Sequence, residues 1–336
     1  NKSVNIRNEM AVFALIIGIT GLYFSSSFVR LELFAGISVI ILSSIGISIL
    51  ITKLFTQKNT VGSVTKISFI SCIVILLVIP VGLPTNQNWV TASSIAPAIL
   101  SGGSYLIAPT NDWPDAMLWL KTNTPEDAKI LSWWDYGYWI ETLGDRTTYL
   151  DNATLDTQII KKTAEIFYTP TDDAWQELMA IDADYVLIWI TADKVLSSHQ
   201  TPLYLLGIGG GDESKRFWFA QVADVPIQKY FFDDLLSGPN AFWHDTLLGE
   251  MIPFSPAVYV DVENEKEYNQ YQPNTVGVYV KNHKLPINPI DAMDAPLQLV
   301  YTSPSFDRSD DGEMSMVLIY KVNKDYDPRF NYDILN

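Results

Sequence analysis

The chain has 336 residues, enough for two domains or more, and a formal net charge of −16 at pH 7. Residues 1–84 hold only six basic and two acidic residues, which leaves 16 basic and 36 acidic residues in the remainder. So acidic a surface repels phosphate groups, which excludes nucleic-acid binding. The single cysteine, Cys72, excludes an intrachain disulfide.

Three apolar runs open the chain, at residues 10–28, 33–50 (continuing to 55) and 67–83. Each approaches the roughly 20 residues that span a bilayer. None has the polar face that a buried helix of a soluble protein would show. We therefore predict three transmembrane helices in residues 1–84. Because residue 1 is Asn, we expect them to be the last spans of a longer membrane domain.

The basic residues set the expected orientation of these spans. The connection 52–66 has three lysines and no acid, whereas the short turn 29–32 has one basic and one acidic residue. The positive-inside rule places the first connection in the cytoplasm and the second outside. We therefore predict a multi-pass protein of the cell membrane whose C-terminal domain is extracytoplasmic.

Residues 85–252 are predicted to form a central α/β core. Its first part, 85–110, is rich in Ser, Asn, Pro and Gly and is typical of a linker. The continuous apolar run 185–191 (YVLIWIT) indicates a strand covered on both faces. The other expected elements are helices at about 114–121, 154–167 and 172–181 and a strand at 129–133.

Residues 253–336 are predicted to form a β-rich C-terminal domain. Short alternating runs separated by Pro, Asn and Asp are typical of antiparallel strands, and they occur at 257–262, 276–280, 297–302 and 314–322. The predicted fold class is an α-helical membrane segment of three spans, followed by an extracytoplasmic mixed α/β domain with a β-rich C-terminal part.

The pentad WWDYG consists of Trp133, Trp134, Asp135, Tyr136 and Gly137. Buried indole N–H groups need acceptors, and a buried carboxylate needs donors or a counter-charge. The first three residues supply two donors and one acceptor, a set able to surround a single hydroxyl. The alternative is an aromatic cluster whose aspartate caps a local turn.

A second candidate lies in the glycine-rich segment 207–222, which lacks the Gly-Lys-Ser/Thr of a phosphate-binding loop. If a helix begins near Asp212, then Asp212, Lys215 and Phe219 lie on one of its faces. Asp212 suits the positive end of a helix and can pair with Lys215. The alternative is a capped helix with an exposed ion pair.

The pentad resembles the signature of the oligosaccharyltransferase catalytic subunit, the membrane enzyme that glycosylates Asn in Asn-X-Ser/Thr sequons. In that family the two Trp and the Asp read the Ser/Thr hydroxyl two residues after the acceptor Asn. Asp212 and Lys215 match a second family motif, Asp-x-x-Lys-x-x-x-Met/Ile, on a helix beside the peptide site. Phe219 departs from its last position but offers an apolar wall to a Thr methyl group.

Two further sequences resemble family features. Arg30 stands in a Val-Arg-Leu setting, where the family has an arginine that contacts the pyrophosphate of the lipid-linked donor. The alternative is an arginine that reaches the membrane interface. Asp151-Asn152-Ala153-Thr154 echoes a family Asp-Asn-x-Thr run and is itself a sequon, so Asn152 is a glycosylation candidate if exposed. We favour Asp151 or Asn152 as the cap of the following helix.

The resemblance implies an archaeal-type enzyme that transfers an oligosaccharide from a lipid donor to an acceptor polypeptide. It also implies a divalent metal, Mn or Mg, held by carboxylates upstream of residue 1. This chain then contains no catalytic residues or metal ligands, and we expect it to be inactive alone. The alternatives are a membrane-anchored, non-catalytic module that binds peptides or glycans on an aromatic platform, and another lipid-donor glycosyltransferase that does not read sequons.

Overall fold

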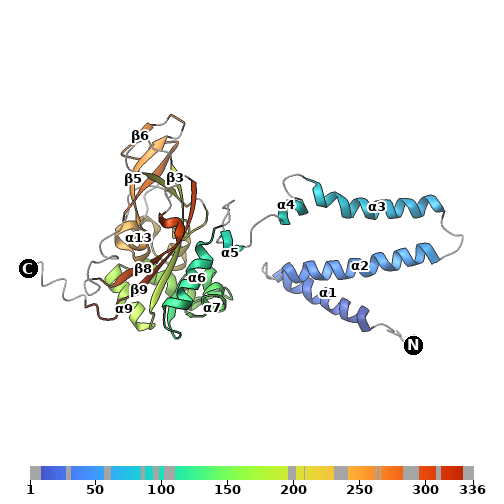
Figure 1. The fold of residues 1–336 in the computed structure, drawn as a ribbon, viewed down its shortest axis with the longest axis horizontal. Helices are drawn as coiled ribbons and strands as arrows, with labels where there is room; N and C mark the ends of the chain where they lie inside the picture. The colour runs from blue at the N-terminus through green and yellow to red at the C-terminus, as the bar shows by residue number, and fades with distance from the viewer. Residues whose placement is uncertain are drawn as a thin grey trace, which may run out of the picture. The chain divides into compact units, whose positions relative to one another are not determined.

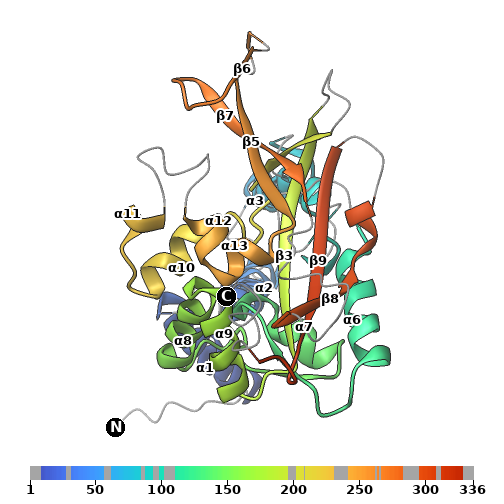
Figure 2. The ribbon, with the colours of Figure 1, turned by 90° about the vertical axis from the view of Figure 1, so that its left-hand side faces the viewer.

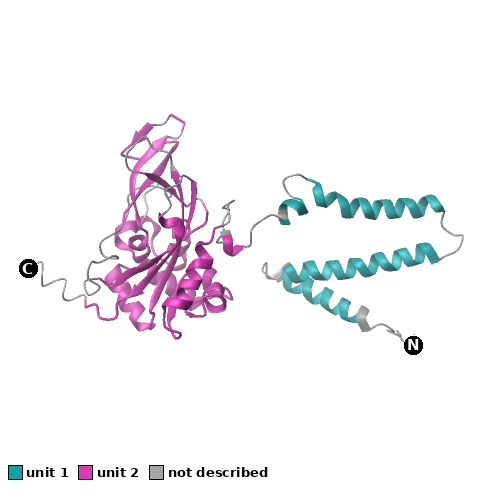
Figure 3. Cartoon of the chain, in the orientation of Figure 1, with its two compact units in different colours: residues 1–95 teal, residues 96–336 magenta. Residues whose placement is uncertain are grey.

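The computed structural model forms two compact units, residues 1–95 and 96–336, each described by itself (Figures 1 and 3). The described residues are 9–27, 32–56, 62–84, 88–93, 98–101, 110–195, 202–207, 209–230, 241–261, 263–264, 266–282, 295–307 and 312–327.

The first unit is helical. Its helices are α1 (Glu9–Ser27), α2 (Glu32–Thr56), α3 (Ser63–Gly82) and α4 (Trp89–Ser93). Two stretches, Leu33–Thr56 and Ser63–Gly82, are long and apolar enough to cross a bilayer, whereas the apolar part of α1, Val12–Ser26, is shorter. The third predicted span and the predicted orientation therefore remain predictions.

Small residues allow α1 and α2 to approach closely. A Cβ added at Gly21 would lie 2.3 Å from Ser38 Oγ and 2.9 Å from the Phe34 carbonyl oxygen. The Ser38 hydroxyl donates to the Ile17 carbonyl across the helix pair at 3.1 Å. Small residues at helix contacts are typical of membrane proteins, where close packing replaces hydrophobic driving force.

The second unit is built on a mixed sheet with nine strands among its described residues. They are β1 (Lys129–Leu131), β2 (Thr147–Thr148), β3 (Tyr185–Val195), β4 (Leu203–Leu206), β5 (Phe254–Asp261), β6 (Lys266–Tyr268), β7 (Thr275–Lys281), β8 (Leu297–Thr302) and β9 (Gly312–Val322). The order is β2-β1-β3-β4-β7-β5-β6, with β9 paired to β3 and β8 paired to β9. β1 pairs in parallel with β2 and β3, and the other pairings are antiparallel.

Helices cover this sheet on both sides. The described helices of this unit are α5 (Ala98–Ser101), α6 (Asp112–Asn123), α7 (Gly137–Thr142), α8 (Thr157–Tyr168), α9 (Thr171–Ala180), α10 (Arg216–Val222), α11 (Ile227–Tyr230), α12 (Phe242–Asp245) and α13 (Leu247–Met251). Figure 2 shows α8, α9, α10, α12 and α13 on one side of β3 and β9, and α6 on the other. This arrangement explains why β3 is a continuous apolar run.

The mixed α/β architecture predicted for the external part is confirmed. The predicted boundary between residues 252 and 253 lies inside the second unit. Strand β3 precedes this boundary and β9 follows it, yet the two pair along ten residues, from Tyr185↔Lys321 to Lys194↔Gly312. The predicted strand at 129–133 ends at Leu131, where the chain turns into the pentad.

The helix cap predicted at Asp151 or Asn152 is wrong. The helix begins at Thr157, and Asp156 caps it by accepting hydrogen bonds from the backbone N–H groups of Gln158 and Ile159. A side-chain oxygen immediately before the first helical residue can reach these N–H groups, whereas one four or five positions earlier cannot. Residues 151–156 form a loop instead.

Candidate functional site

The site occupies a gap along one edge of β3. β1 pairs with the start of this edge, at Tyr185 and Val186, and β4 pairs with its end from Ala192 onward. Between them a turn replaces a strand: the Trp189 N–H donates to Asp212 Oδ2 at 2.9 Å, and the Asp212 N–H donates to the Trp189 carbonyl at 2.7 Å. The pentad leaves β1 at this gap, so both candidate segments meet there.

The pentad is a 3-10 helix, Trp134–Tyr136, that continues into α7. Trp133 is only 5% exposed and Tyr136 only 1%, whereas Trp134 and Asp135 are partly exposed. A short helical turn places successive side chains about 100–120° apart, which separates the buried Tyr136 from the accessible Asp135. Within the pentad, Trp133 and Tyr136 therefore pack in the core, whereas Trp134 and Asp135 are accessible from solvent.

A charged network joins the pentad to the Asp-x-x-Lys segment. Lys215 Nζ donates to Asp135 Oδ2 at 2.7 Å and to the Tyr136 hydroxyl at 3.0 Å, and it lies 3.7 Å from Asp212 Oδ1. The Tyr136 hydroxyl in turn donates to Asp212 Oδ1 at 2.6 Å. The predicted Asp212–Lys215 pair is present, and it extends to two pentad residues about 80 positions away.

The predicted helical face of Asp212, Lys215 and Phe219 is wrong, because α10 begins only at Arg216. Asp212 and Lys215 lie in the preceding turn, where the Lys215 N–H donates to the Asp212 carbonyl at 3.2 Å. The Asp212 side chain is 1% exposed, so its bond with Lys215 is no surface ion pair. Lys215, by contrast, is 20% exposed and reaches solvent.

Burial and neighbouring charges control the protonation of this network. Burial, followed by the charges of Asp212 and Asp135, holds the pKa of Tyr136 well above its usual range. Burial also raises the pKa of Asp212, although Lys215 and the hydrogen bond from Tyr136 oppose this rise. Tyr136 therefore stays a proton donor and connects Lys215 to Asp212.

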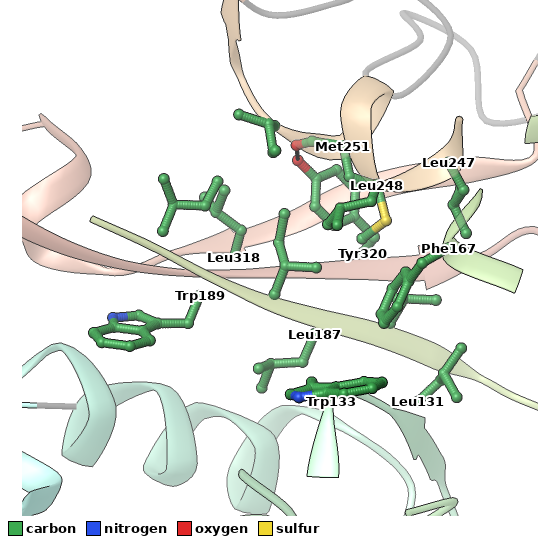
Figure 4. Close-up of a cluster of buried hydrophobic side chains, with 14 of the residues drawn as sticks. Leu131, Trp133, Phe167, Leu187, Trp189, Leu247, Leu248, Met251, Leu318 and Tyr320 are labelled. Carbon is green, nitrogen blue, oxygen red and sulfur yellow. Dashed lines mark hydrogen bonds between the residues drawn. The ribbon is translucent and has the colours of Figure 1, made fainter. Parts of the chain in front are cut away.

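Phe219 packs against Trp133 of the pentad. It is fully buried, and its ring packs edge-on against Trp133 with ring centroids 4.4 Å apart and planes at 89°. Figure 4 shows Trp133 within the buried cluster, together with Leu131, Leu187 and Phe167. Phe219 thus acts on the site through Trp133, and its predicted contact with a peptide stays a prediction.

Position 137 requires glycine because the backbone at residues 150 and 151 passes very close to it. A Cβ at this position would lie 2.5 Å from Asp151 Cα and 2.6 Å from the Leu150 carbonyl oxygen. Both are backbone atoms, so no side-chain rotation relieves the clash. We expect Gly137→Ala to lower the free energy of unfolding by about 2–4 kcal/mol, as overpacking against a fixed backbone does.

Urea unfolding of the whole chain in detergent, followed by Trp fluorescence, measures this effect. Nine of the ten Trp residues lie in residues 96–336, so the signal reports on the second unit. Gly210→Ala is a weaker control: its Cβ would meet nothing within 4 Å, although its φ of +86° adds a local strain. Equal stability losses in the two variants would contradict the clash.

Two further predictions concern Arg30 and the implied divalent metal. Arg30 lies outside the described residues, so its contact with a lipid phosphate stays a prediction. Within the described ranges, no three His, Cys, Asp or Glu residues come together as a metal site. These residues do not fit the implied divalent metal, and no step of the chemistry is assigned to it.

Sequence reasoning missed Glu213 and Thr191. Glu213 is fully buried beside Asp212, and its Oε1 accepts a hydrogen bond from the Thr191 hydroxyl at 2.7 Å. The Gly209 N–H also donates to the Thr191 hydroxyl oxygen, at 3.0 Å. An acidic pair directly after three glycines was the available signal, since glycines let a backbone fold closely over a buried group.

Known proteins similar to this chain are protein glycosyltransferase subunits. No family model matches the chain. It is 29% identical over 238 residues to the dolichyl-diphosphooligosaccharide–protein glycosyltransferase subunit STT3B of Oryza sativa subsp. japonica, which covers 61% of this chain and 33% of the relative. It is 30% identical over 212 residues to subunit STT3 of Dictyostelium discoideum, covering 59% and 29%. The chain thus spans about a third of the length of the curated relatives it matches.

Among solved structures, the C-terminal globular domain of an oligosaccharyltransferase from Archaeoglobus fulgidus is similar. It has 17% identity and a TM-score of 0.35, and covers 64% of this chain and 99% of that domain. The predicted resemblance to the oligosaccharyltransferase family is confirmed by the two sequence relatives. The two sequence relatives are eukaryotic, and the predicted archaeal type stays a prediction.

Proposed function

We propose that this chain is the C-terminal part of an oligosaccharyltransferase and that it recognises the hydroxyl of Ser or Thr in Asn-X-Ser/Thr. The observation that carries this proposal is the 2.7 Å bond between Lys215 Nζ and Asp135 Oδ2. It brings the family's two peptide-site motifs into one network in the gap of β3. The similarity to the glycosyltransferase subunits supports the same function.

The chemistry of the pentad suits a hydroxyl. Lys215 holds Asp135 Oδ2, while Oδ1 makes no hydrogen bond within the described residues and the side chain is 28% exposed. The Trp133 indole N–H makes no hydrogen bond with the described residues, and the residue is 5% exposed. A hydroxyl needs one acceptor for its proton and one donor for its oxygen, and Asp135 and Trp133 supply these groups.

We further propose that the divalent metal and the reacting carboxylates belong to parts of the enzyme outside this chain. An amide nitrogen is a weak nucleophile, and its activation needs such groups. The role of this chain is then to select the acceptor. The extracytoplasmic placement of its second unit is part of the same proposal.

The test compares the binding of three peptides, Asn-Ala-Thr, Asn-Ala-Ser and Asn-Ala-Ala in a common flanking sequence, to the whole chain in detergent. Fluorine NMR of labelled peptides detects weak binding. We expect the Thr and Ser peptides to bind more tightly than the Ala peptide. Asp135→Ala should remove this preference, a loss of about tenfold, because the hydroxyl then lacks its charged acceptor.

Asp127→Ala is the matched control, because Asp127 is exposed and belongs to a turn after α6. It should leave the preference unchanged. Equal binding of all three peptides by the unmodified chain would contradict hydroxyl recognition and favour a binding module with an aromatic platform. A preference that survives Asp135→Ala would contradict the role of Asp135.

A further inference from the structure

The loop that follows β2 holds the pentad through one side chain. Asn152 Nδ2 donates to the Asp135 carbonyl oxygen at 2.8 Å, and Asn152 Oδ1 accepts from the Tyr138 N–H at 3.0 Å. These two backbone groups are three residues apart, the spacing that a 3-10 turn bonds directly. A single carboxamide, with one donor and one acceptor, therefore spans the turn that carries Asp135.

The backbone around Asn152 is fixed against this turn. Asp151 comes so near to Gly137 that no Cβ fits between them. Asp151 Oδ1 accepts from the Ala153 N–H at 2.8 Å, which closes a tight turn. Thr154 has a φ of +50°, a left-handed conformation that is rare for a β-branched residue. Strain of this kind persists only where surrounding contacts enforce it, and it concentrates at functional sites.

Asp135 is thus held from two sides. Asn152 holds its backbone carbonyl, and Lys215 holds one oxygen of its carboxylate. The remaining carboxylate oxygen, Oδ1, is the group assigned to the hydroxyl of the acceptor. Its position depends on the orientation of the Asp135 backbone as much as on the side-chain torsions.

We propose that Asn152 is a positioning residue for acceptor selection: its carboxamide clamps the turn that aims Asp135 at the sequon hydroxyl. This proposal rests on the proposed function of the pentad. It also assigns Asn152 a role other than glycosylation acceptor, because its Nδ2, the atom that a glycan would modify, is a donor in the clamp.

Asn152→Asp tests the clamp with almost no change of shape. The introduced carboxylate still accepts from the Tyr138 N–H, but it can no longer donate to the Asp135 carbonyl, which then faces a negative oxygen. At pH 7.5 we expect the preference for the Thr peptide over the Ala peptide to fall about tenfold. Protonation restores an O–H donor, so the preference should return toward that of the unmodified chain, measured at the same pH, as the pH falls toward the ordinary Asp pKa of about 3.9.

Thr154→Ala is the matched control. It removes the Asn-X-Thr sequon but keeps Asn152, and it should keep the preference. If Asn152→Asp simply unfolded the site, the preference for the Thr peptide would not return on acidification. The pH profile of this preference therefore separates a positioning role from unfolding. An Asn152→Asp chain with unchanged preference, while Asp135→Ala abolishes it, would overturn the clamp and leave the proposed function standing. Loss of preference in Thr154→Ala equal to that in Asn152→Asp would also overturn it. An unmodified chain without any preference would overturn the proposed function, and the clamp with it.

Discussion

Replacing Asp212 with alanine is expected to destabilise the second unit by about 3–5 kcal/mol, the cost of breaking a buried charged network on one side. The carboxylate is fully buried and accepts hydrogen bonds from the Tyr136 hydroxyl and the Trp189 N–H. Alanine leaves both donors without this acceptor. Each orphaned buried donor costs about 1–3 kcal/mol.

The same substitution should also weaken the pentad. With Asp212 absent, the Tyr136 hydroxyl has Lys215 as its remaining partner, and the turn loses its side-chain bond to the edge of β3. We therefore expect the preference for Thr peptides to fall together with stability. Asp212→Asn retains an acceptor for the Trp189 N–H and should recover part of the stability.

Urea unfolding in detergent, followed by Trp fluorescence, measures the loss, and Asp127→Ala again serves as the exposed control. Substitution of an exposed aspartate outside any network should change stability by about 0.5 kcal/mol or less. Equal unfolding midpoints for Asp212→Ala and Asp127→Ala would show that the network contributes no stability.

The site was predictable from sequence only in part. The unusual composition of the pentad identified it as a candidate site, and the family resemblance assigned Asp212 and Lys215 to the same site. The geometry that joins them was not visible locally, because β1 has three residues and β4 begins to pair only at Ala192. The gap between them on β3 is a property of the whole sheet.

Asp212 and Lys215 lie outside the predicted helix for a related reason. Helical periodicity predicts neighbours along one helix, whereas the turn at Asp212 is held by the backbone of Trp189. Such a long-range bond leaves no periodic signal. Strands β3, β8 and β9 were predicted because their apolar, β-branched runs are long enough to be recognised as strands from the sequence.

Short strands were missed for the opposite reason. β2 has two residues and β6 has three, and their pairing depends on neighbours supplied by the fold. The loop that contains Asn152 was read as a helix cap, because Asp and Asn favour both positions. Only the structure shows that Asp156 caps the helix and leaves Asn152 to bind the pentad.

Glu213 should make the stability of the second unit depend on pH. Burial raises the pKa of this carboxyl to about 7, although its bonds with Thr191 and its own backbone oppose the rise. Within the described residues, Oε1 binds the Thr191 hydroxyl and the buried Oε2 has no partner. The folded chain therefore holds the proton up to about pH 7, whereas the unfolded chain releases it near the ordinary value of 4.5.

The sign of the effect follows from this difference. Between about pH 4.5 and 7 the unfolded state binds fewer protons than the folded state, so the free energy of unfolding falls as pH rises. The contribution is greatest below pH 4.5 and is lost by about pH 7. At about 1.4 kcal/mol per pH unit, the expected loss is on the order of 3 kcal/mol. The raised pKa of Asp212 acts in the same direction.

Glu213→Gln isolates this contribution, because the amide keeps an oxygen for the Thr191 hydroxyl and cannot ionise. Urea unfolding at a series of pH values from 4.5 to 8 should show a smaller fall for this variant than for the unmodified chain. Glu126→Gln, at an exposed position, should follow the unmodified chain. Parallel curves for all three would show that Glu213 keeps an ordinary pKa in the folded chain. A smaller fall for Glu213→Gln alone would locate the proton on the residue beside Asp212, in the turn that holds Lys215 against the pentad.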